Sequence, residues 1–308
     1  MSYAQPSLMP SFTRPPSRVA IVRSAGYDRD LGALLFDALR EFDLPVGGKK
    51  VLLKPNFVEP DPEGIVNTHP AVVAAAREAF LRLGAETVRV AEGPGHERDT
   101  EAIVETLRLR DFLGPLQEIF VDLNLDDVHQ VKLRTQASKL KQLYFPRTVL
   151  EADYFVSMPK LKTHHWVGVT LSLKNMFGIV PGCCYGWPKN ILHWAGIVSS
   201  ILDLNSTVRP DFAIVDGIIG MEGNGPIQGT AKRSGVLVLG DDPVAVDGTC
   251  ARVMGLDPRR VEYLSKAAVL LGHLQEEKIE QLGESVASVR TPFTLLPAFH
   301  NLIAATVK

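Results

Sequence analysis

A strand, a helix and a second strand follow one another within residues 50–91, which read KVLLKPNFVEPDPEGIVNTHPAVVAAAREAFLRLGAETVRVA. The apolar run predicts a strand over 50–53. An initial proline, alanine-rich turns and a glycine beyond the last turn predict a helix over 71–83. A further strand is expected over 87–91. Strands that alternate with helices in this way are typical of an α/β fold with a largely parallel sheet.

The same alternation continues along most of the chain. We expect further strands over 18–23, 120–122, 153–158, 212–215 and 235–239, one or two more near the C-terminus, and helices over 30–42, 100–109, 193–204, 245–254 and 261–271. Residues 131–145 predict a small antiparallel excursion. The sequence therefore predicts an α/β fold whose mostly parallel sheet is flanked by helices.

The first half of the chain alternates cleanly, whereas the second half is organised around loops. This contrast places a division near residue 150. We expect a flexible leader over 1–17, an α/β subdomain over 18–150 and a second α/β subdomain over 151–308. A single domain over 18–308 is the alternative, because no low-complexity linker divides the chain.

Composition excludes several classes of protein. The net charge of −2 gives no basic field for nucleic acid. No run approaches the roughly 20 apolar residues that span a bilayer, so we expect no membrane contact. Cys183, Cys184 and Cys250 cannot supply the four thiolates of a conventional iron–sulfur cluster, so this chain alone would hold none. The odd cysteine count argues against a disulfide scaffold and indicates a reducing, cytoplasmic location.

The densest group of cations lies in residues 158–182, MPKLKTHHWVGVTLSLKNMFGIVPG, where lysines and histidines are interleaved with apolar residues. Because partly buried ammonium groups need partners, this pattern predicts a pocket for an anion. Lys160 and Lys162 alternate in an extended chain and so share a face. His164 and His165 would point to opposite sides, so at most one of them is expected to face the pocket.

Polar clusters follow five of the predicted strands. In open α/β sheets, ligands bind beyond the carboxyl ends of the strands. If the strands are parallel, all five clusters meet at one edge of the sheet. The clusters are residues 54–56, 92–96, 160–165, 216–226 and 241–247.

The candidate site residues fall into three groups. Buried lysines can neutralise a carboxylate or phosphate, and one with a lowered pKa can act as a base or attach a cofactor. Aspartates can hold a divalent metal or fix the lysines. The candidates for catalysis are Lys162, His164, Lys174 and Glu92; those for substrate binding are Lys54, Asn56, Lys160, Thr163, Thr170, Asn175 and Asn224; and those for a metal are Asp216 and Asp247.

Several of these residues have plainer structural alternatives. Glu92 and His96 can form an acid/base pair, or belong to an ordinary turn. Asn67 or Thr68 can cap the helix that follows them. Asp247 can likewise stabilise a helix, although it should already lie inside the one predicted over 245–254. These residues are consistent with either of two cofactors, a divalent metal or a group attached to a lysine.

The motifs together resemble the family catalogued as domain of unknown function 362, over about residues 18–260. Many members of that family append a cysteine-rich ferredoxin-like segment and are described as iron–sulfur proteins. Such a segment is absent from these residues, so a redox role implies a separate redox partner protein. The arrangement is also distantly similar to nickel-dependent lactate racemase proteins, in which lysine and histidine serve an organometallic cofactor. The resemblance rests on Lys54-Pro55-Asn56, Thr68-His69-Pro70, Glu92-Gly93, Pro159-Lys-Leu-Lys-Thr-His164, Lys174-Asn175, Gly178, Asp216-Gly217, Gly223–Pro226, Gly240–Asp247 and Met254-Gly255.

Two functions are consistent with this site. The first is an enzyme that acts on a small anionic substrate, with redox or isomerase chemistry favoured over hydrolysis because no GxSxG signature is present. The alternative is a non-catalytic binding or maturation protein for an anionic metabolite or metallocofactor. A structural subunit with a decayed site is a third alternative, and five intact polar clusters argue against it.

Overall fold

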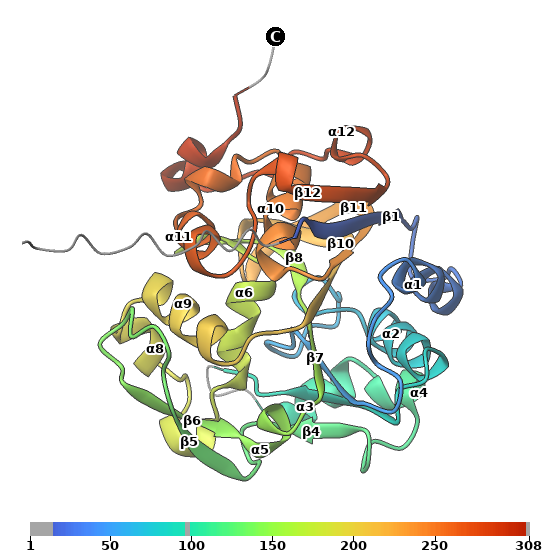
Figure 1. The fold of residues 1–308 in the computed structure, drawn as a ribbon, viewed down its shortest axis with the longest axis vertical. Helices are drawn as coiled ribbons and strands as arrows, with labels where there is room; N and C mark the ends of the chain where they lie inside the picture. The colour runs from blue at the N-terminus through green and yellow to red at the C-terminus, as the bar shows by residue number, and fades with distance from the viewer. Residues whose placement is uncertain (1–14, 96–98, 306–308) are drawn as a thin grey trace, which may run out of the picture.

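The computed structural model describes residues 15–95 and 99–305 and is built around one large sheet (Figure 1). Its strands are β1 (Ser17–Arg23), β2 (Lys50–Pro55), β3 (Thr87–Glu92), β4 (Phe120–Asp122), β7 (Tyr154–Met158), β8 (Lys160–His164), β9 (Gly168–Thr170), β10 (Phe212–Asn224), β11 (Gln228–Gly240) and β12 (Ile279–Gly283). The strand order is β12-β1-β11-β10-β7-β2-β3-β4, with β8 paired to β10 and to β9. β11 is antiparallel to both neighbours, and the other neighbouring pairs on this path are parallel.

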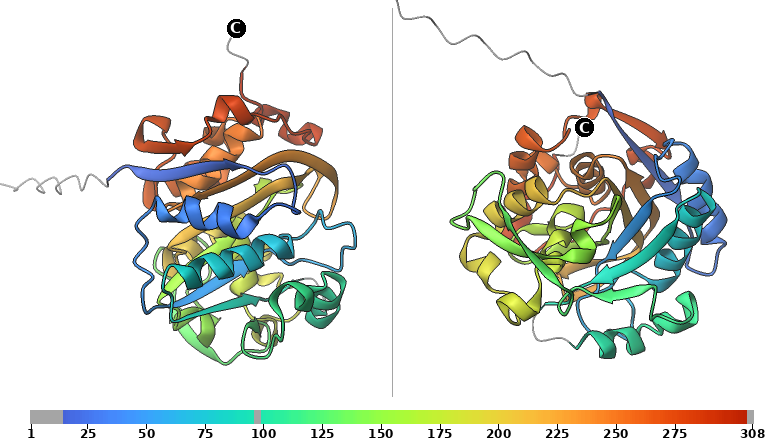
Figure 2. Two further views of the ribbon diagram at one scale, coloured as in Figure 1. Left: turned by 90° about the vertical axis from the view of Figure 1, so that its right-hand side faces the viewer. Right: turned by 60° about the horizontal axis from the view of Figure 1, so that its bottom comes forward.

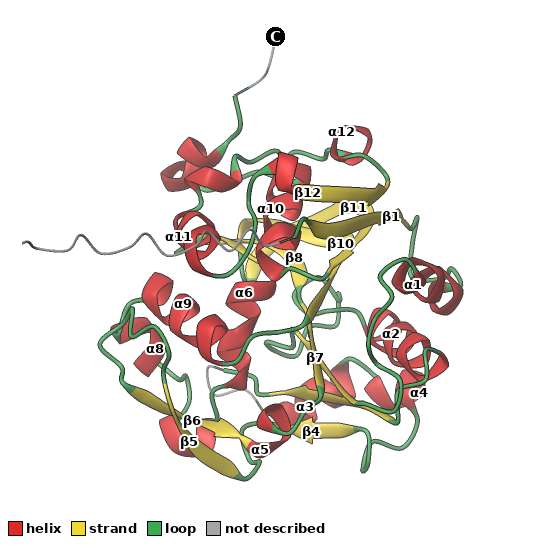
Figure 3. Cartoon of the chain, in the orientation of Figure 1, coloured by secondary structure: helices red, strands yellow, loops and turns green. Residues whose placement is uncertain are grey.

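Helices cover both faces of the sheet (Figures 2 and 3). They are α1 (Leu31–Arg40), α2 (Pro70–Arg82), α3 (Thr100–Thr106), α4 (Leu109–Leu113), α5 (Arg147–Leu150), α6 (Ser172–Asn175), α7 (Gly182–Tyr185), α8 (Ile191–Trp194), α9 (Ile197–Thr207), α10 (Pro243–Val253), α11 (Glu262–Leu270) and α12 (Val286–Val289). A separate antiparallel pair, β5 (Val128–Lys132) and β6 (Gln142–Pro146), forms the small excursion. The predicted fold class is therefore confirmed.

Alternate side chains of β10 supply two different cores. Phe212 and Ile214 pack with α1 to α4 on one face, while Ala213 and Val215 pack with α10 and α11 on the other. This division follows from the two-residue period of an extended strand. Complete burial of one such aliphatic side chain stabilises the fold by about 1.5–3 kcal/mol. The near-continuous apolar run of the strand thus fits a sheet that is covered on both sides.

The polar cluster predicted over 216–226, beyond the end of a strand, instead lies mostly within β10. The strands predicted over 212–215 and 235–239 are the buried ends of β10 and β11, which continue into one long hairpin. The glycines permit close packing of β8, since a Cβ on Gly220 would lie 2.5 Å from the carbonyl oxygen of Leu161. A composition typical of loops here reflects close backbone approach within a sheet.

The direction of β11 corrects the expected convergence of all five polar clusters. Because β11 is antiparallel, its carboxyl end lies at the opposite edge from those of β2 and β3. The cluster 241–247 is therefore separated from the others. Asp242 there accepts hydrogen bonds from the Val244 N–H, which caps α10, and from the Ser17 hydroxyl.

Two predicted helices are each divided in the structure. The helix expected over 100–109 breaks into α3 and α4 at Arg108, whose φ is 52°. The helix expected over 193–204 breaks into α8 and α9 at Gly196, whose φ is 101°. The first break places a non-glycine residue in the left-handed region, which periodicity does not reveal.

The sheet is continuous across residue 150, since β2 pairs with β7. The division into two subdomains stays a prediction. Ser17, within the predicted leader, begins β1, and residues 1–14 lie outside the described part of the chain. Among the described helices, none combines the length and the apolar character needed to cross a bilayer.

Candidate functional site

A cavity of about 340 Å³ lies at the carboxyl ends of β2, β3 and β8. Its remaining walls come from β9, α6, residues 188–193 and the β10–β11 turn. The structure thus joins segments that are far apart in the sequence, as expected for the carboxyl edge of parallel strands. The predicted site residues that line it are Lys54, Asn56, Glu92, Lys162, His164, Thr170, Lys174 and Asn175.

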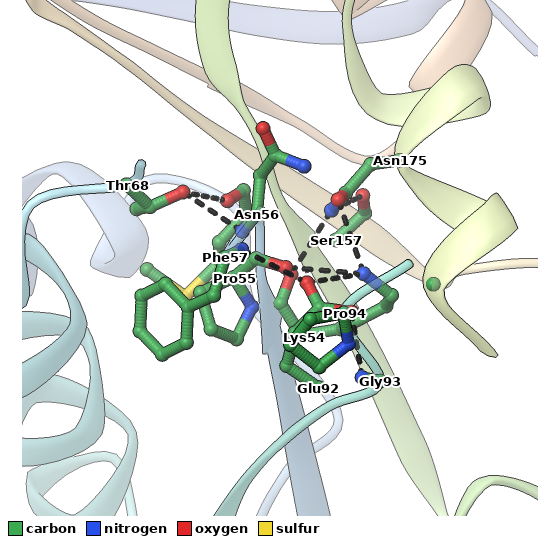
Figure 4. A network of polar contacts seen from close by, with 12 residues as sticks. Lys54, Pro55, Asn56, Phe57, Thr68, Glu92, Gly93, Pro94, Ser157 and Asn175 are labelled. Carbon is green, nitrogen blue, oxygen red and sulfur yellow. Dashed lines mark hydrogen bonds and ion pairs between the residues drawn. The ribbon is translucent and has the colours of Figure 1, made fainter. Parts of the chain in front are cut away.

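Lys54 and Glu92 form a buried ion pair at this cavity, with Nζ 2.8 Å from Oε2 (Figure 4). The Lys54 ammonium also donates to the Asn175 side-chain oxygen at 3.1 Å. Glu92 accepts two further bonds, from the backbone N–H groups of Phe57 and Gly93. Burial lowers the pKa of Lys54, and the Glu92 charge opposes that shift. The carboxylate is thus held by three donors rather than left free to move a proton.

Three further lysines reach the cavity without a carboxylate partner among the described residues. The Lys162 ammonium donates to the Val66 carbonyl at 2.8 Å, and the Lys189 ammonium to the Gly93 carbonyl at 2.5 Å. The Lys174 ammonium lies over an aromatic ring, 3.8 Å from the Phe177 centroid. The direct contacts of these three ammonium groups are with neutral carbonyls and an aromatic ring.

Burial lowers the pKa of each of these three lysines to about 7. For Lys162, the charges of Lys160 and Lys174 add to the effect of burial. For Lys174 the added charge is that of Lys54. For Lys189 the charge of Glu92 opposes the shift. A lysine with a pKa of about 7 can both give and take a proton at neutral pH.

His164 and His165 both line the cavity, which corrects the expectation that at most one would face it. β8 ends at His164, so the strict alternation of an extended strand stops there. The His164 Nδ1 accepts the Trp166 N–H at 3.0 Å, which places its proton on Nε2. Burial, with the Lys174 charge, lowers the pKa of His164 well below its usual value, so this imidazole is neutral at pH 7.

Two buried polar atoms on the cavity wall have no hydrogen-bond partner within residues 15–95 and 99–305. They are the Asn56 side-chain oxygen and the Thr170 hydroxyl. An orphaned buried polar atom costs free energy, roughly 1–3 kcal/mol, unless a ligand or water satisfies it. The Thr170 hydroxyl can donate to an anion, whereas the Asn56 oxygen requires a donor.

Residues 51–252 match a family described as Domain of unknown function (DUF362). The chain belongs to this family. A thylakoid-associated protein of Synechocystis sp. is 29% identical over 265 residues, which cover 80% of this chain and 77% of that protein.

Two solved structures resemble the DUF362 chain at low sequence identity. The lactate racemase apoprotein from Thermoanaerobacterium thermosaccharolyticum has a TM-score of 0.47 and 13% identity, over 78% of this chain and 57% of that one. A protein from Thermotoga maritima has a TM-score of 0.30 and 12% identity, over 62% and 50% of the two chains. The matched part of the chain therefore spans 57% of the first protein and half of the second.

Lys160 and Asp216 of the DUF362 chain form a second buried ion pair outside the lining of this cavity, with Nζ 2.9 Å from Oδ2. Tyr27 donates to the same carboxylate, and the His69 backbone N–H does so as well. The His69 ring stacks on Tyr27 at 3.7 Å, and its Nδ1 caps α2 by accepting the Ala71 N–H. Asp216 therefore fixes Lys160 in position. Of the two roles predicted for this aspartate, metal binding or fixing a lysine, this is the second.

The sequence predicts that Asn67 or Thr68 caps α2. Both side chains instead form hydrogen bonds that hold the loop after β2. The Asn67 side-chain oxygen accepts the Val58 N–H. The Thr68 hydroxyl accepts a hydrogen bond from the Asn56 N–H (Figure 4). It also donates a hydrogen bond to the Met158 carbonyl. These bonds position Asn56 on the cavity wall.

Asp247 bridges two helices instead of reaching the cavity. Its side chain accepts the Ser172 and Leu173 N–H groups at 2.8 and 3.0 Å, and also the Ser172 hydroxyl. Asp247 thus holds the first turn of α6, the helix that carries Lys174. Burial raises the pKa of Asp247 to about 7, against the lowering effect of these three bonds.

The other predicted binding residues are engaged elsewhere. Thr163 donates to the Gly223 carbonyl, and Asn224 is exposed and bonds to Gln228. His96 lies outside the described residues. In the described part of the chain, no group of three or more His, Cys, Asp or Glu side chains is placed to hold a metal ion. The predicted metal roles of Asp216 and Asp247 find no support in their contacts.

Sequence reasoning missed Lys189. Lys189 follows Pro188 in a loop, and with a φ of 60° it turns its side chain inward to the Gly93 carbonyl. His193 lines the cavity, whereas Asp203, ten positions later, instead accepts bonds from Thr135 and Ala137. A lysine in a loop whose side chain turns inward produces no periodic pattern in the sequence, so periodicity could not predict Lys189 as a cavity residue.

Proposed function

We propose that this protein is an enzyme that binds a small anionic substrate in the cavity and moves a proton on it. The supporting observation is the unbalanced charge of the lining. Four lysines reach the cavity, at positions 54, 162, 174 and 189, and the carboxylate of Glu92 is paired with one of them. Buried cations without counter-charges destabilise a fold, and an incoming carboxylate or phosphate would supply that counter-charge.

The lowered pKa values suit acid–base chemistry. At pH 7 the amines of Lys162 and Lys174 divide between their charged and neutral forms. A neutral amine can remove a proton from the carbon beside a substrate carboxylate, while a second ammonium stabilises the enolate charge. Return of a proton to the opposite face of that carbon inverts its configuration and completes an isomerisation with no other reactant. Redox chemistry at the same carbon would need a separate redox partner protein.

A non-catalytic binding or maturation role is the second candidate, and the state of Glu92 favours it. Both carboxylate oxygens are already held by Lys54 and two backbone N–H groups. Glu92 therefore suits a structural role better than the catalytic role predicted for it. If the lysines serve as fixed charges, they would hold an anionic metabolite or a cofactor without turning it over.

Binding of acetate and inorganic phosphate, measured by isothermal titration calorimetry, tests the anion site. We expect Lys174→Met to weaken binding at least tenfold, a loss of about 1.4 kcal/mol. Lys139→Met, at an exposed lysine outside the cavity, should leave binding unchanged. Equal binding by wild type and Lys174→Met would refute the anion site.

Proton transfer is tested separately in D2O. Small carboxylates are incubated with the protein, and exchange at the carbon beside the carboxylate is followed by proton NMR. We expect exchange with wild type and its loss in Lys162→Met. Anion binding with no exchange for any acid tried would favour the binding protein over the enzyme.

A further inference from the structure

The mouth of the cavity is aromatic. His165, Trp166, Phe177 and His193 all line it and are partly or largely exposed, and we call them the aromatic rim. Trp166 meets His165 and His193 edge to face, with ring centroids 4.5 and 5.2 Å apart. Phe177 meets His193 at 5.6 Å in the same manner. Each edge-to-face contact covers one face of one ring, so other ring faces of the rim are left for a ligand.

The cavity changes character with depth. The cationic floor consists of Lys54, Lys162, Lys174 and Lys189, of which Lys54 and Lys162 are 0% exposed. Trp166, on the rim, is 57% exposed. Phe177 joins the two regions, since one ring face covers the Lys174 ammonium and the ring also meets His193 in a T-shaped contact. A ligand that enters from solvent would thus pass aromatic rings before it reaches the charges.

The volume also exceeds what a small anion needs. At about 340 Å³ the cavity falls at the lower end of the roughly 300–1,000 Å³ typical of pockets for drug-sized ligands. A carboxylate alone would engage the floor and leave the rim in contact with water. The body of the ligand should therefore fill the space between the floor and the rim rings.

We propose that the substrate is an aromatic acid with a hydrogen on the carbon beside its carboxylate, such as an arylacetate. Its carboxylate would bind the cationic floor, and its ring would pack against Trp166 and His193. This assignment rests on the proposed anion site and narrows its substrate class. The largely exposed Trp166 ring offers a face for stacking, at low entropic cost because the side chain has few rotatable bonds. A saturated acid of equal size would fill the volume without the ring–ring contact.

Calorimetry with phenylacetate, cyclohexylacetate and acetate tests this proposal. We expect phenylacetate to bind roughly three- to tenfold more tightly than cyclohexylacetate, the range for one aromatic contact. Trp166→Ala should remove that preference and leave acetate affinity within about twofold of wild type, since acetate reaches only the floor. The matched control is Trp194→Ala, because Trp194 is 83% exposed and does not line the cavity.

The outcomes separate the two proposals. Acetate binding that depends on Lys174, without a preference for phenylacetate over cyclohexylacetate, would overturn the aromatic assignment and keep the anion site. A preference that survives Trp166→Ala would overturn it as well. If none of the three acids binds to wild type, the anion site itself fails. Thermal unfolding of both tryptophan variants checks that each remains folded.

Discussion

At the scale of single residues, the Lys54–Glu92 pair shows how a buried charge is tolerated. Each partner is satisfied beyond the ion pair, Lys54 by Asn175 and Glu92 by backbone N–H groups. Such satisfaction is the condition under which burial of an ion pair does not destabilise the fold. Lys162, Lys174 and Lys189 lack an equivalent carboxylate among the described residues.

Removal of one member of that pair should be costly. Glu92→Gln leaves the Lys54 charge buried and unpaired, and we expect the free energy of unfolding to fall by roughly 3–5 kcal/mol. The double variant Lys54→Met/Glu92→Gln should recover part of the loss. Urea denaturation gives the comparison. The exposed Arg82–Glu78 pair, at 3.8 Å, is the reference, and Glu78→Gln should change stability by less than about 0.5 kcal/mol. Similar losses of unfolding free energy in Glu92→Gln and Glu78→Gln would contradict this account.

At the scale of elements, the positions of the site residues depend on short segments held from outside. α6 spans only Ser172–Asn175 and receives its cap from Asp247 in the interior of α10. A helix of one turn has little stability of its own. The geometry of Lys174 is thus set by a carboxylate far away in the sequence.

Loss of that cap should affect both stability and binding. Asp247→Ala leaves the Ser172 and Leu173 N–H groups without their acceptor, and we expect a loss of roughly 2–4 kcal/mol together with weaker acetate binding. Asp30→Ala removes the exposed cap of α1 and should cost about 1 kcal/mol without affecting acetate. Chemical denaturation and calorimetry on both variants test this. Unchanged acetate affinity in a folded Asp247→Ala protein would contradict the link to Lys174.

At the scale of the whole molecule, Lys162, Lys174 and Lys189 should shape the dependence of stability on pH. Their folded pKa values of about 7 lie below the ordinary value of 10.5. Between these values the unfolded chain binds more protons, so stability rises with pH from about 7 to 10 and the penalty is fully present below 7. We expect anion binding to follow the opposite trend, because it needs the charged amines.

Thermal unfolding between pH 7 and 9.5 gives the test. We expect the melting temperature of the anion-free protein to rise over this interval, and Lys174→Met to reduce the slope. Added phosphate should stabilise more strongly at pH 7 than at pH 9.5. A flat profile that Lys174→Met leaves unchanged would show that these amines stay charged throughout.

Much of the fold could be predicted because strand and helix periods are local properties. The convergence of Lys54, Glu92 and Lys162 followed from the expectation of parallel strands. The long β10–β11 hairpin could not be predicted, because its glycines are explained by the approach of β8, a contact distant in sequence. Lys189 was missed for the same reason, since its partner is the Gly93 carbonyl.

The order of the strands has a consequence for synthesis of the chain. β1 leaves the ribosome before the other strands, yet its sheet neighbours are β11 and β12, among the last strands to be made. While the segments between β1 and β11 are translated, β1 is an apolar strand whose two edges have no native partner. Unpaired apolar edges are prone to aggregation. A nascent chain stalled before residue 236 should therefore rely on chaperones to shield Val19–Val22.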